Sequence, residues 1–247
     1  MKTLVNKLGY LNIIISFIII IVFNKELFIP KEGIDSLQRD IKKSAEERTL
    51  LLEWGTATWS GVILSSGFNH MKALTIIHED SMKKIMDSKE SNVFITLNSG
   101  EKYSAKIKRW NSCNELALLE INDGKNFKFN KPPNLELKES YLSESLFSFG
   151  HPLGLNLHYS EGYLSSYGNK IKPCGMITNG FSGGTIPGQT GSGVWNNNGE
   201  LSGLIVATSA FPIKSINKDG EMIGMSTIPV TFLGRFIPSS EIKIFLK

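Results

Sequence analysis

The sequence is poor in cysteine and carries little net charge. Only two of its 247 residues are cysteines, Cys113 and Cys174. Two cysteines are too few for a disulfide framework, and their spacing suits no metal site. They could pair in an oxidising compartment, but we expect two free, buried thiols. The net charge of +4 comes from 27 Lys and Arg against 23 Asp and Glu, scattered along the chain, and gives no indication of nucleic-acid binding.

Internal repeats, phosphate-binding glycine loops and clusters of metal-ligating residues are also missing. The lack of a repeat argues against solenoids and propellers. Without a phosphate loop or a ligand cluster, no organic cofactor and no metal ion are expected. The length of 247 residues suits one domain with short extensions, and the hydrophobic content of 41% fits a globular core plus one membrane segment.

One long apolar run stands near the start of the chain. Residues 8–23 are nearly all apolar, and Lys2 and Lys7 precede them, as in the basic region of a signal sequence. No small residues that would direct cleavage follow, and the run is shorter than the roughly 20 residues of a typical spanning helix. We expect residues 1–30 to form an uncleaved signal anchor, with the bulk of the protein on the extracytoplasmic side. A buried helix of a soluble protein is the alternative.

The segments 31–49 and 50–247 differ in the spacing of their apolar residues. In the first, Ile34, Leu37 and Ile41 recur at helical spacing among charged residues, which predicts a helical linker. From residue 50 onward, short apolar runs alternate with turns of Gly, Asn and Ser, with almost no helix between them. This pattern indicates an all-β barrel or sandwich.

Within residues 50–247, a polar segment and the C-terminal end differ from the pattern of short strands. The polar segment 124–140 contains Pro132 and Pro133 and suits a crossover between two subdomains. At the end, Ser240–Lys247 predicts a short C-terminal helix with a serine N-cap.

The stretch from Pro187 to Val206 carries the strongest indication of chemistry. Three glycines surround Thr190 and Ser192, and glycine tolerates the backbone angles of a concave turn whose N–H groups point inward. Converging N–H groups beside a hydroxyl are what an acyl-transfer site requires, a nucleophile and donors for the oxyanion. The alternative is a polar hairpin loop without chemistry.

This stretch resembles the nucleophile loop of trypsin/chymotrypsin-like serine proteases, especially the HtrA/Deg type. In that family a Gly-x-Ser-Gly-Gly turn is followed by an apolar strand, a Gly-Glu hairpin and a second strand. Here residues 188–192 occupy the turn, and Gly199-Glu200 falls where the hairpin is expected. The nucleophile position holds Thr190 and not serine.

Four other segments resemble the same family in the same chain order. They are Ser60-Gly-Val-Ile, Leu74-Thr-Ile-Ile-His78, Glu115-Leu-Ala-Leu-Leu119 and Ser148-Phe-Gly-His-Pro-Leu-Gly-Leu155. The order His, acid, nucleophile is that of the chymotrypsin fold. The resemblance covers roughly Trp54 to the C-terminus and implies two six-stranded antiparallel β-barrels, chymotrypsin-like, in residues 50–247. Because the sequence ends after the short helix, we expect no peptide-binding PDZ domain of the kind that HtrA-type proteases often carry.

The resemblance also implies a role for each site residue. His78 would take the proton of the Thr190 hydroxyl and return it to the leaving amine, and Glu115 would orient the imidazole. The N–H groups of Gly188 and Thr190 would bind the oxyanion. The pocket for the substrate residue before the scissile bond would lie at Gly184, Thr185, Ala207 and Thr208. No carboxylate lies there, so a Lys or Arg preference is not expected.

Two departures from the family pattern bear on activity. Glu115 replaces the family's Asp and adds one methylene, and a misplacement of about 1 Å can lower the rate about 10²-fold. Thr190 adds a methyl group that restricts χ1 and crowds the attack path. Threonine nucleophiles are normally activated by their own N-terminal amine, and Thr190 is internal.

Several residues compete with this assignment. Asp80 is a rival acid, expected instead in a turn, and Glu115 could be a strand-edge charge. Ser182 is a rival nucleophile in Gly180-Phe-Ser-Gly-Gly184, but no apolar strand and Gly-Glu hairpin follow it. Ser192 would put the oxyanion loop out of register. The other histidines, His70, His151 and His158, are expected to be structural.

Three hypotheses follow. The first is a membrane-anchored endopeptidase with a polypeptide substrate and a His/acid/hydroxyl triad. The second is a pseudoprotease, a binding or scaffold module with the same fold that Thr190 has disabled. The third is a non-hydrolytic β-barrel protein with a coincidental likeness, which a model that brings His78, Glu115 and Thr190 within hydrogen-bond reach would eliminate.

Overall fold

The strands of this chain close into two antiparallel barrels of six strands each, as predicted. The computed structural model describes residues 31–66, 70–88, 92–121, 135–170, 174–216 and 222–247. The chain divides into two compact units between Ile41 and Lys42, and both barrels belong to the second unit. The predicted crossover at 124–140 lies mostly outside the described residues, between the last strand of the first barrel and the first strand of the second.

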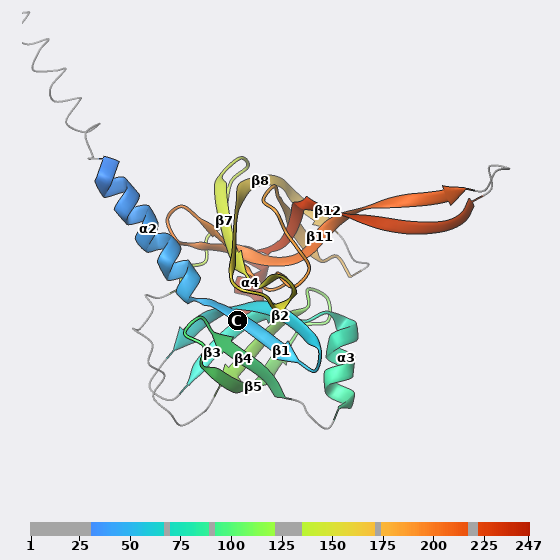
Figure 1. The fold of residues 1–247 in the computed structure, drawn as a ribbon, viewed down its shortest axis with the longest axis horizontal. Coiled ribbons are helices and arrows are strands. Elements are labelled where there is room, and N and C mark those ends of the chain that lie inside the picture. The colour runs from blue at the N-terminus through green and yellow to red at the C-terminus, as the bar shows by residue number, and fades with distance from the viewer. Residues whose placement is uncertain (1–30, 67–69, 89–91, 122–134, 171–173, 217–221) are drawn as a thin grey trace, which may run out of the picture. The chain divides into compact units, whose positions relative to one another are not determined.

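The first barrel has the strand order β1-β2-β3-β6-β5-β4 (Figure 1). Its strands are β1 (Thr49–Trp54), β2 (Ala57–Ser66), β3 (Met71–Ile76), β4 (Asn92–Leu97), β5 (Lys102–Trp110) and β6 (Leu116–Ile121). In β4 the buried residues Val93, Ile95 and Leu97 alternate with more exposed ones, because successive side chains of a strand point to opposite faces. These alternating apolar residues fill the barrel interior.

The second barrel has the strand order β10-β11-β12-β9-β8-β7. Its strands are β7 (Ser145–Gly150), β8 (His158–Lys170), β9 (Ile177–Phe181), β10 (Gly193–Asn196), β11 (Leu201–Ile216) and β12 (Met222–Pro238). Between β7 and β8 lies a single 3-10 turn, η1 (Pro152–Gly154). The core of this barrel includes Phe181, Val194, Ile205 and Phe236.

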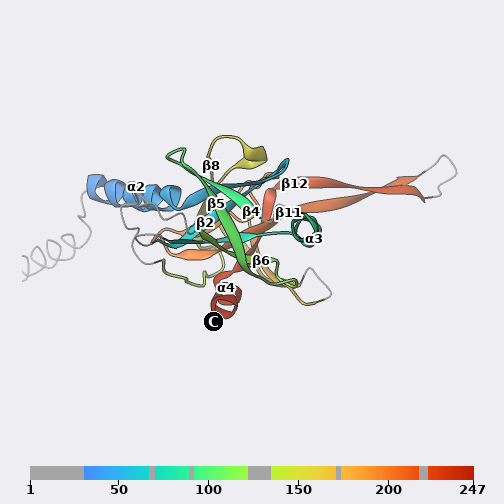
Figure 2. The same ribbon diagram turned by 90° about the horizontal axis from the view of Figure 1, so that it is seen from below.

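Strands β11 and β12 form a long hairpin. Their pairing runs from Gly203↔Pro238 to Ile216↔Met222. The far end of this hairpin extends as a two-stranded ribbon away from the barrels (Figures 1 and 2).

Helices α3 and α4 lie wholly within the barrel unit, and α3 was not predicted. Helix α3 (Glu79–Asp87) begins directly after His78 and buries Met82 and Ile85. Helix α4 (Ser239–Leu246) is the predicted C-terminal helix, but its N-cap is Pro238 and no side-chain cap bond forms, so the predicted serine cap is wrong. The buried Phe245 of α4 lies under the guanidinium of Arg109, 4.3 Å from the ring centroid, and so contacts the first barrel.

Helix α2 (Lys31–Glu47) spans most of the predicted helical linker, residues 31–49. The predicted signal anchor, residues 1–30, lies outside the described residues. Within the described residues, no helix is long and apolar enough to cross a membrane.

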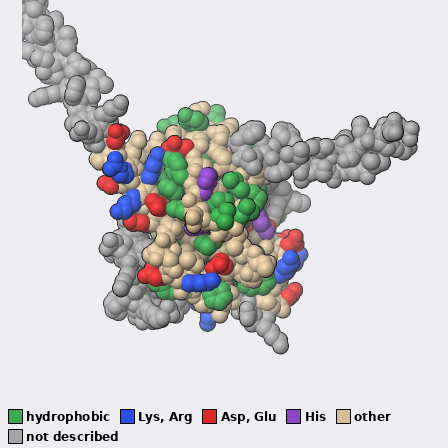
Figure 3. All heavy atoms as spheres, viewed as in Figure 1, with side chains coloured by type: hydrophobic (Ala, Val, Ile, Leu, Met, Phe, Trp, Pro, Cys, Tyr) green, Lys and Arg blue, Asp and Glu red, His purple; other side chains and the backbone are tan. Residues whose placement is uncertain are grey.

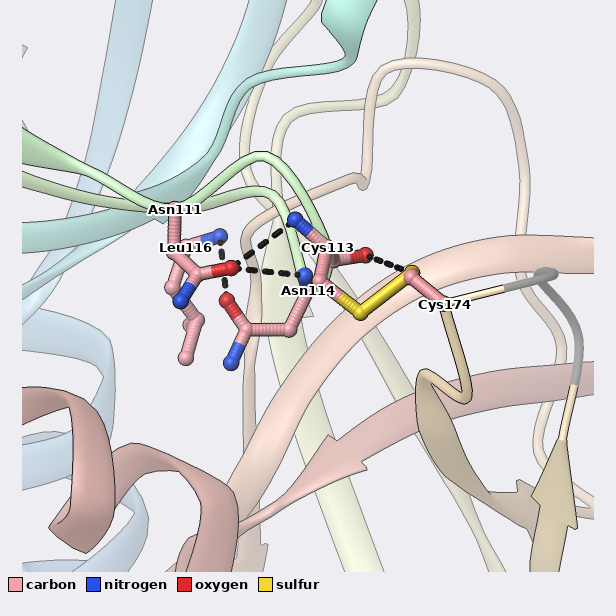
Figure 4. The surroundings of a disulfide bond; sticks show 5 residues. All are labelled: Asn111, Cys113, Asn114, Leu116 and Cys174. Atoms are coloured by element: carbon pink, nitrogen blue, oxygen red, sulfur yellow. Dashed lines mark hydrogen bonds between the residues drawn. A yellow bond between two sulfur atoms is a disulfide. The ribbon is translucent and has the colours of Figure 1, made fainter.

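The two cysteines are not the free, buried thiols that the sequence indicated. Cys113, between β5 and β6, and Cys174, between β8 and β9, form a disulfide that joins the two barrels (Figure 4). Cys174 is exposed and Cys113 half-buried. The expectation failed because a separation of 61 residues does not reveal that the two barrels bring these loops together.

Candidate active site

His78 and Glu115 meet because β3 and β6 are neighbours in the first barrel. The pair Ile76↔Leu116 ends the ladder between these strands, and the next backbone bond runs from Ile77 N–H to the Glu115 carbonyl at 2.9 Å. Just beyond it, His78 Nδ1 lies 2.8 Å from Glu115 Oε2. The carboxyl group is nearly buried, whereas the imidazole is about half exposed. With Nδ1 facing the carboxylate, Nε2 is left for a different partner.

A backbone N–H binds the Glu115 carboxylate, and two asparagine side chains stabilise the turn around Glu115. Its second oxygen, Oε1, accepts a hydrogen bond from the N–H of Glu79 at 2.9 Å, in the first turn of α3. Glu115 itself has φ 56°, a left-handed conformation that costs a non-glycine residue about 1–2 kcal/mol. Asn111 and Asn114 stabilise this turn by accepting N–H groups of Cys113, Asn114 and Leu116 (Figure 4).

The turn that carries Thr190 is held by its own hydrogen bonds. Gln189 is fully buried, and its side-chain oxygen accepts the N–H of Ile186 at 2.8 Å. The Gln189 N–H in turn donates to the Ile186 carbonyl at 3.0 Å. Gly188 has φ +95°, and a Cβ there would lie 2.3 Å from the backbone nitrogen of Leu153. Position 188 therefore requires glycine.

The first barrel supports this turn directly. The Ser60 N–H donates to the Thr190 carbonyl at 2.8 Å, and the Ser60 hydroxyl donates to the Gly188 carbonyl at 3.0 Å. With two carbonyls thus accepted, the backbone around Thr190 has a fixed orientation. Within the described part of the chain, the N–H groups of Gly188 and Thr190 donate no hydrogen bond, so both remain free to bind an anion.

His78 and Thr190 line one cavity of about 290 Å³ between the barrels. No hydrogen bond joins the two side chains among the residues that the structure describes. Figure 3 shows apolar and histidine side chains close together on one face of the molecule, with charged side chains to either side of them and below them. The structure thus brings His78 against Glu115 and places Thr190 across the same cavity.

The residues predicted to form the pocket before the scissile bond lie in the second barrel. The hydroxyls of Thr185 and Thr208 are 3.3 Å apart, with Thr185 fully buried. Gly184 and Ala207 are each half-buried next to them in the chain. Gly234 was not predicted from the sequence, and a Cβ there would lie 2.4 Å from the Thr185 methyl carbon. The Ser60 hydroxyl was given no role either, although Ser60 belongs to one of the motifs.

The rival residues have other surroundings. Asp80 is exposed in the first turn of α3, not in a loop turn, and the Ser182 hydroxyl accepts the Tyr163 N–H at 2.8 Å. Ser192 is fully buried, and neither serine lines the cavity beside His78. His151 is buried, and its Nδ1 lies 3.1 Å from the Leu155 carbonyl, so this nitrogen carries the proton.

Comparison with known proteins adds a family and a fold. The model of the trypsin-like peptidase domain family matches residues 60–204, which include His78, Glu115 and Thr190. Among solved structures, the chain is similar to an inactive form of Rv3671c from M. tuberculosis H37Rv, a serine-to-alanine mutant, with a TM-score of 0.59 and 13% identity. That match covers 83% of this chain and 88% of the other, and at this identity it shows a shared fold alone. No curated protein matches the sequence.

Proposed function

Because this chain belongs to the trypsin-like peptidase domain family, we propose that it is an endopeptidase with His78, Glu115 and Thr190 as its catalytic residues. The observation that carries the proposal is the position of His78. Its Nδ1 is paired to a nearly buried carboxylate at 2.8 Å, while its ring lines the same cavity as the Thr190 hydroxyl. A general base with one nitrogen fixed and a hydroxyl in the same cavity is suited to nucleophilic catalysis.

Each step of peptide hydrolysis can then be assigned to a named residue. Nε2 of His78 takes the Thr190 hydroxyl proton as the threonine oxygen attacks the peptide carbonyl carbon. The free N–H groups of Gly188 and Thr190 bind the oxyanion that forms. The imidazolium, stabilised by Glu115, returns the proton to the leaving nitrogen, the C–N bond breaks, and an ester to Thr190 remains. Water, deprotonated by His78, attacks this ester, and the imidazolium returns the proton to the Thr190 oxygen as its bond to the acyl carbon breaks.

A second candidate function is that of a pseudoprotease that binds polypeptides without cleaving them. Two observations favour it: the extra methyl group of Thr190, and the lack of a hydrogen bond between His78 and Thr190 in the described part of the chain. Such bonds often form only in the complex with substrate, so the endopeptidase stays the main proposal.

Cleavage of a quenched fluorescent casein by the full chain in detergent tests the proposal. The native protein is compared with His78→Ala, Thr190→Ala and Thr190→Ser. Turnover that both alanine variants abolish supports the endopeptidase. If the native protein does not cleave casein but Thr190→Ser does, the result supports the pseudoprotease. Activity that survives in His78→Ala or in Thr190→Ala contradicts the catalytic assignment.

The proposed location is outside the cytoplasm, with residues 1–30 as a membrane anchor. The Cys113–Cys174 disulfide supports it, because disulfides persist in oxidising compartments and are rare in the cytosol. Fractionation with alkaline extraction, followed by thiol labelling before and after reduction, tests both parts. Recovery in the soluble fraction, or fully reduced thiols in the native protein, would contradict this location.

A further inference from the structure

The cavity beside the proposed nucleophile does not coincide with the pocket predicted in the second barrel. It is lined by Ala57–Trp59 of β2, by Ile76, Ile77, His78 and Ser81, and by Pro187, Gly188 and Thr190. None of Gly184, Thr185, Ala207 or Thr208 is among these residues. The cavity therefore lies on the first-barrel side of Thr190, away from the pair Thr185 and Thr208.

The proton transfer from His78 to the leaving group decides which part of a substrate lies on the first-barrel side of Thr190. The imidazole that accepts the nucleophile's proton gives it to the nitrogen of the leaving group. The residue that supplies this nitrogen must lie against His78 when the bond breaks. His78 lines the cavity, so the side chain of a substrate residue held there would lie at the cavity.

The lining is apolar and its size suits one side chain. Ala57, Trp59, Ile76, Ile77 and Pro187 contribute apolar surface, and Trp59 is 7% exposed. Apart from His78, the polar contributors Thr58, Ser81 and Thr190 have hydroxyls, and none of the described lining residues carries a formal charge. The volume of about 290 Å³ is at the lower limit of small-molecule pockets, which span roughly 300–1,000 Å³.

We propose that this cavity is a specificity pocket for the residue immediately after the scissile bond, and that it selects a large apolar side chain such as Leu. The proposal rests on the proposed function, since it takes Thr190 as the nucleophile. A charged side chain would lose its hydration without gaining a partner in this lining. Selection on this side means that the residue at the newly formed N-terminus of the product helps to define the preferred cleavage sites.

Two Ala→Leu variants, one on each side of Thr190, form a matched test. Quenched peptides that differ only in the residue after the scissile bond (Gly, Ala, Leu or Asp) are compared by kcat/KM. We expect Leu to exceed Gly by at least about tenfold, as apolar pockets discriminate about 10–200-fold per methylene. Ala57→Leu should remove most of this ratio by filling the cavity, whereas Ala207→Leu should leave the ratio unchanged. Equal rates for Leu and Gly peptides would overturn the proposal.

A binding measurement separates this proposal from the proposed function. The peptides Leu-Gly-Ala-Gly-amide and Gly-Gly-Ala-Gly-amide mimic the amino-terminal end of a leaving product, and calorimetry on the full chain gives their Kd without turnover. At least about tenfold tighter binding of the Leu peptide, lost in Ala57→Leu, supports the pocket even if no hydrolysis occurs. Equal binding, or discrimination unaffected by Ala57→Leu, overturns the pocket even if the protein is an active protease.

Discussion

The hydroxyl of Ser60 donates a hydrogen bond to the carbonyl oxygen of Gly188 over 3.0 Å, which joins the first barrel to the turn that carries Thr190. The same hydroxyl oxygen accepts the N–H of His151 at 2.9 Å. Ser60 is fully buried, so water cannot replace either bond. One side chain of β2 thus bonds to both the turn that carries Thr190 and the turn that follows β7.

Replacing Ser60 with alanine tests this connection. Ser60→Ala leaves the His151 N–H and the Gly188 carbonyl without this partner, and an unsatisfied buried polar group costs about 1–3 kcal/mol. We also expect kcat to fall about 10²-fold, the effect typical of a shift of about 1 Å in a catalytic group. Urea unfolding and peptide hydrolysis measure the two effects.

Ser202→Ala is the matched control for Ser60→Ala. The hydroxyl of Ser202 is also buried and pairs with Ser140 at 2.6 Å, but it does not contact the turn that carries Thr190. This variant should lower the unfolding free energy without lowering kcat. If Ser60→Ala keeps the native kcat, Ser60 does not position the turn that carries Thr190 for catalysis.

Glu115 should affect turnover through its charge and through its length. Glu115→Gln replaces the carboxylate with an amide, which can stabilise the wrong tautomer of His78, and such a change in a serine protease triad costs about 10⁴ in kcat. Glu115→Asp keeps the charge but shortens the side chain, and we expect a loss of about 10². Kinetics with a peptide substrate measure both. Native kcat in Glu115→Gln would show that the carboxylate is only structural.

Part of this site could be predicted from the sequence, because local motifs carry it. The residues His78, Glu115 and Thr190 were proposed from short segments in family order, and the fold places the first two in contact. The bonds of Ser60 to His151 and Gly188 could not be found in this way, since they join segments 91 and 128 residues apart. The Cys113–Cys174 bridge was missed for the same reason.

Helix α3 was missed for a different reason. Its nine residues follow β3 almost directly and bury only Met82 and Ile85, so its apolar pattern is too short to separate a helix from a turn. The glutamate at its first position has a further role, since its N–H binds the Glu115 carboxylate. A local helix thus contributes to a long-range contact that no periodicity indicates.

Removing the disulfide should destabilise the protein. Cys113 and Cys174 are 61 residues apart, and in the chain-entropy model a closed loop of this length stabilises by about 4 kcal/mol. The double variant Cys113→Ser, Cys174→Ser should therefore unfold at a lower urea concentration than the oxidised native protein. Its kcat should fall as well, because Cys113 lies two residues before Glu115 and its bridge ties that loop to the second barrel. Reduced native protein is the control and should match the double variant in both measurements. A difference of less than about 1 kcal/mol would mean that the bridge adds little beyond the barrel contacts.

His151 should make stability depend on pH. Burial lowers the pKa of His151 below its ordinary value of 6.5, although the bond from Nδ1 to the Leu155 carbonyl opposes the shift. Below pH 6.5 the unfolded chain therefore binds a proton at this residue that the folded chain does not. The stabilisation is present above pH 6.5 and is lost as the pH falls from there toward the lowered folded-state pKa, by at most about 1.4 kcal/mol per pH unit.

The variant His151→Asn isolates this effect from other titrating groups. It keeps a polar side chain at the same position but removes the ionisation, while Glu46 and His158, which line the same cavity of about 770 Å³, remain. The native protein should lose more unfolding free energy than the variant between pH 7.5 and pH 5, with urea unfolding as the measurement. The turn of His151 also bonds to the turn that carries Thr190, because the Leu153 N–H donates to the Pro187 carbonyl at 2.9 Å. Acid should loosen this contact first. Hydrogen exchange of the Leu153 amide across the same pH range measures that loosening. If the unfolding free energies of the native protein and of His151→Asn depend equally on pH, protonation of His151 is not coupled to folding.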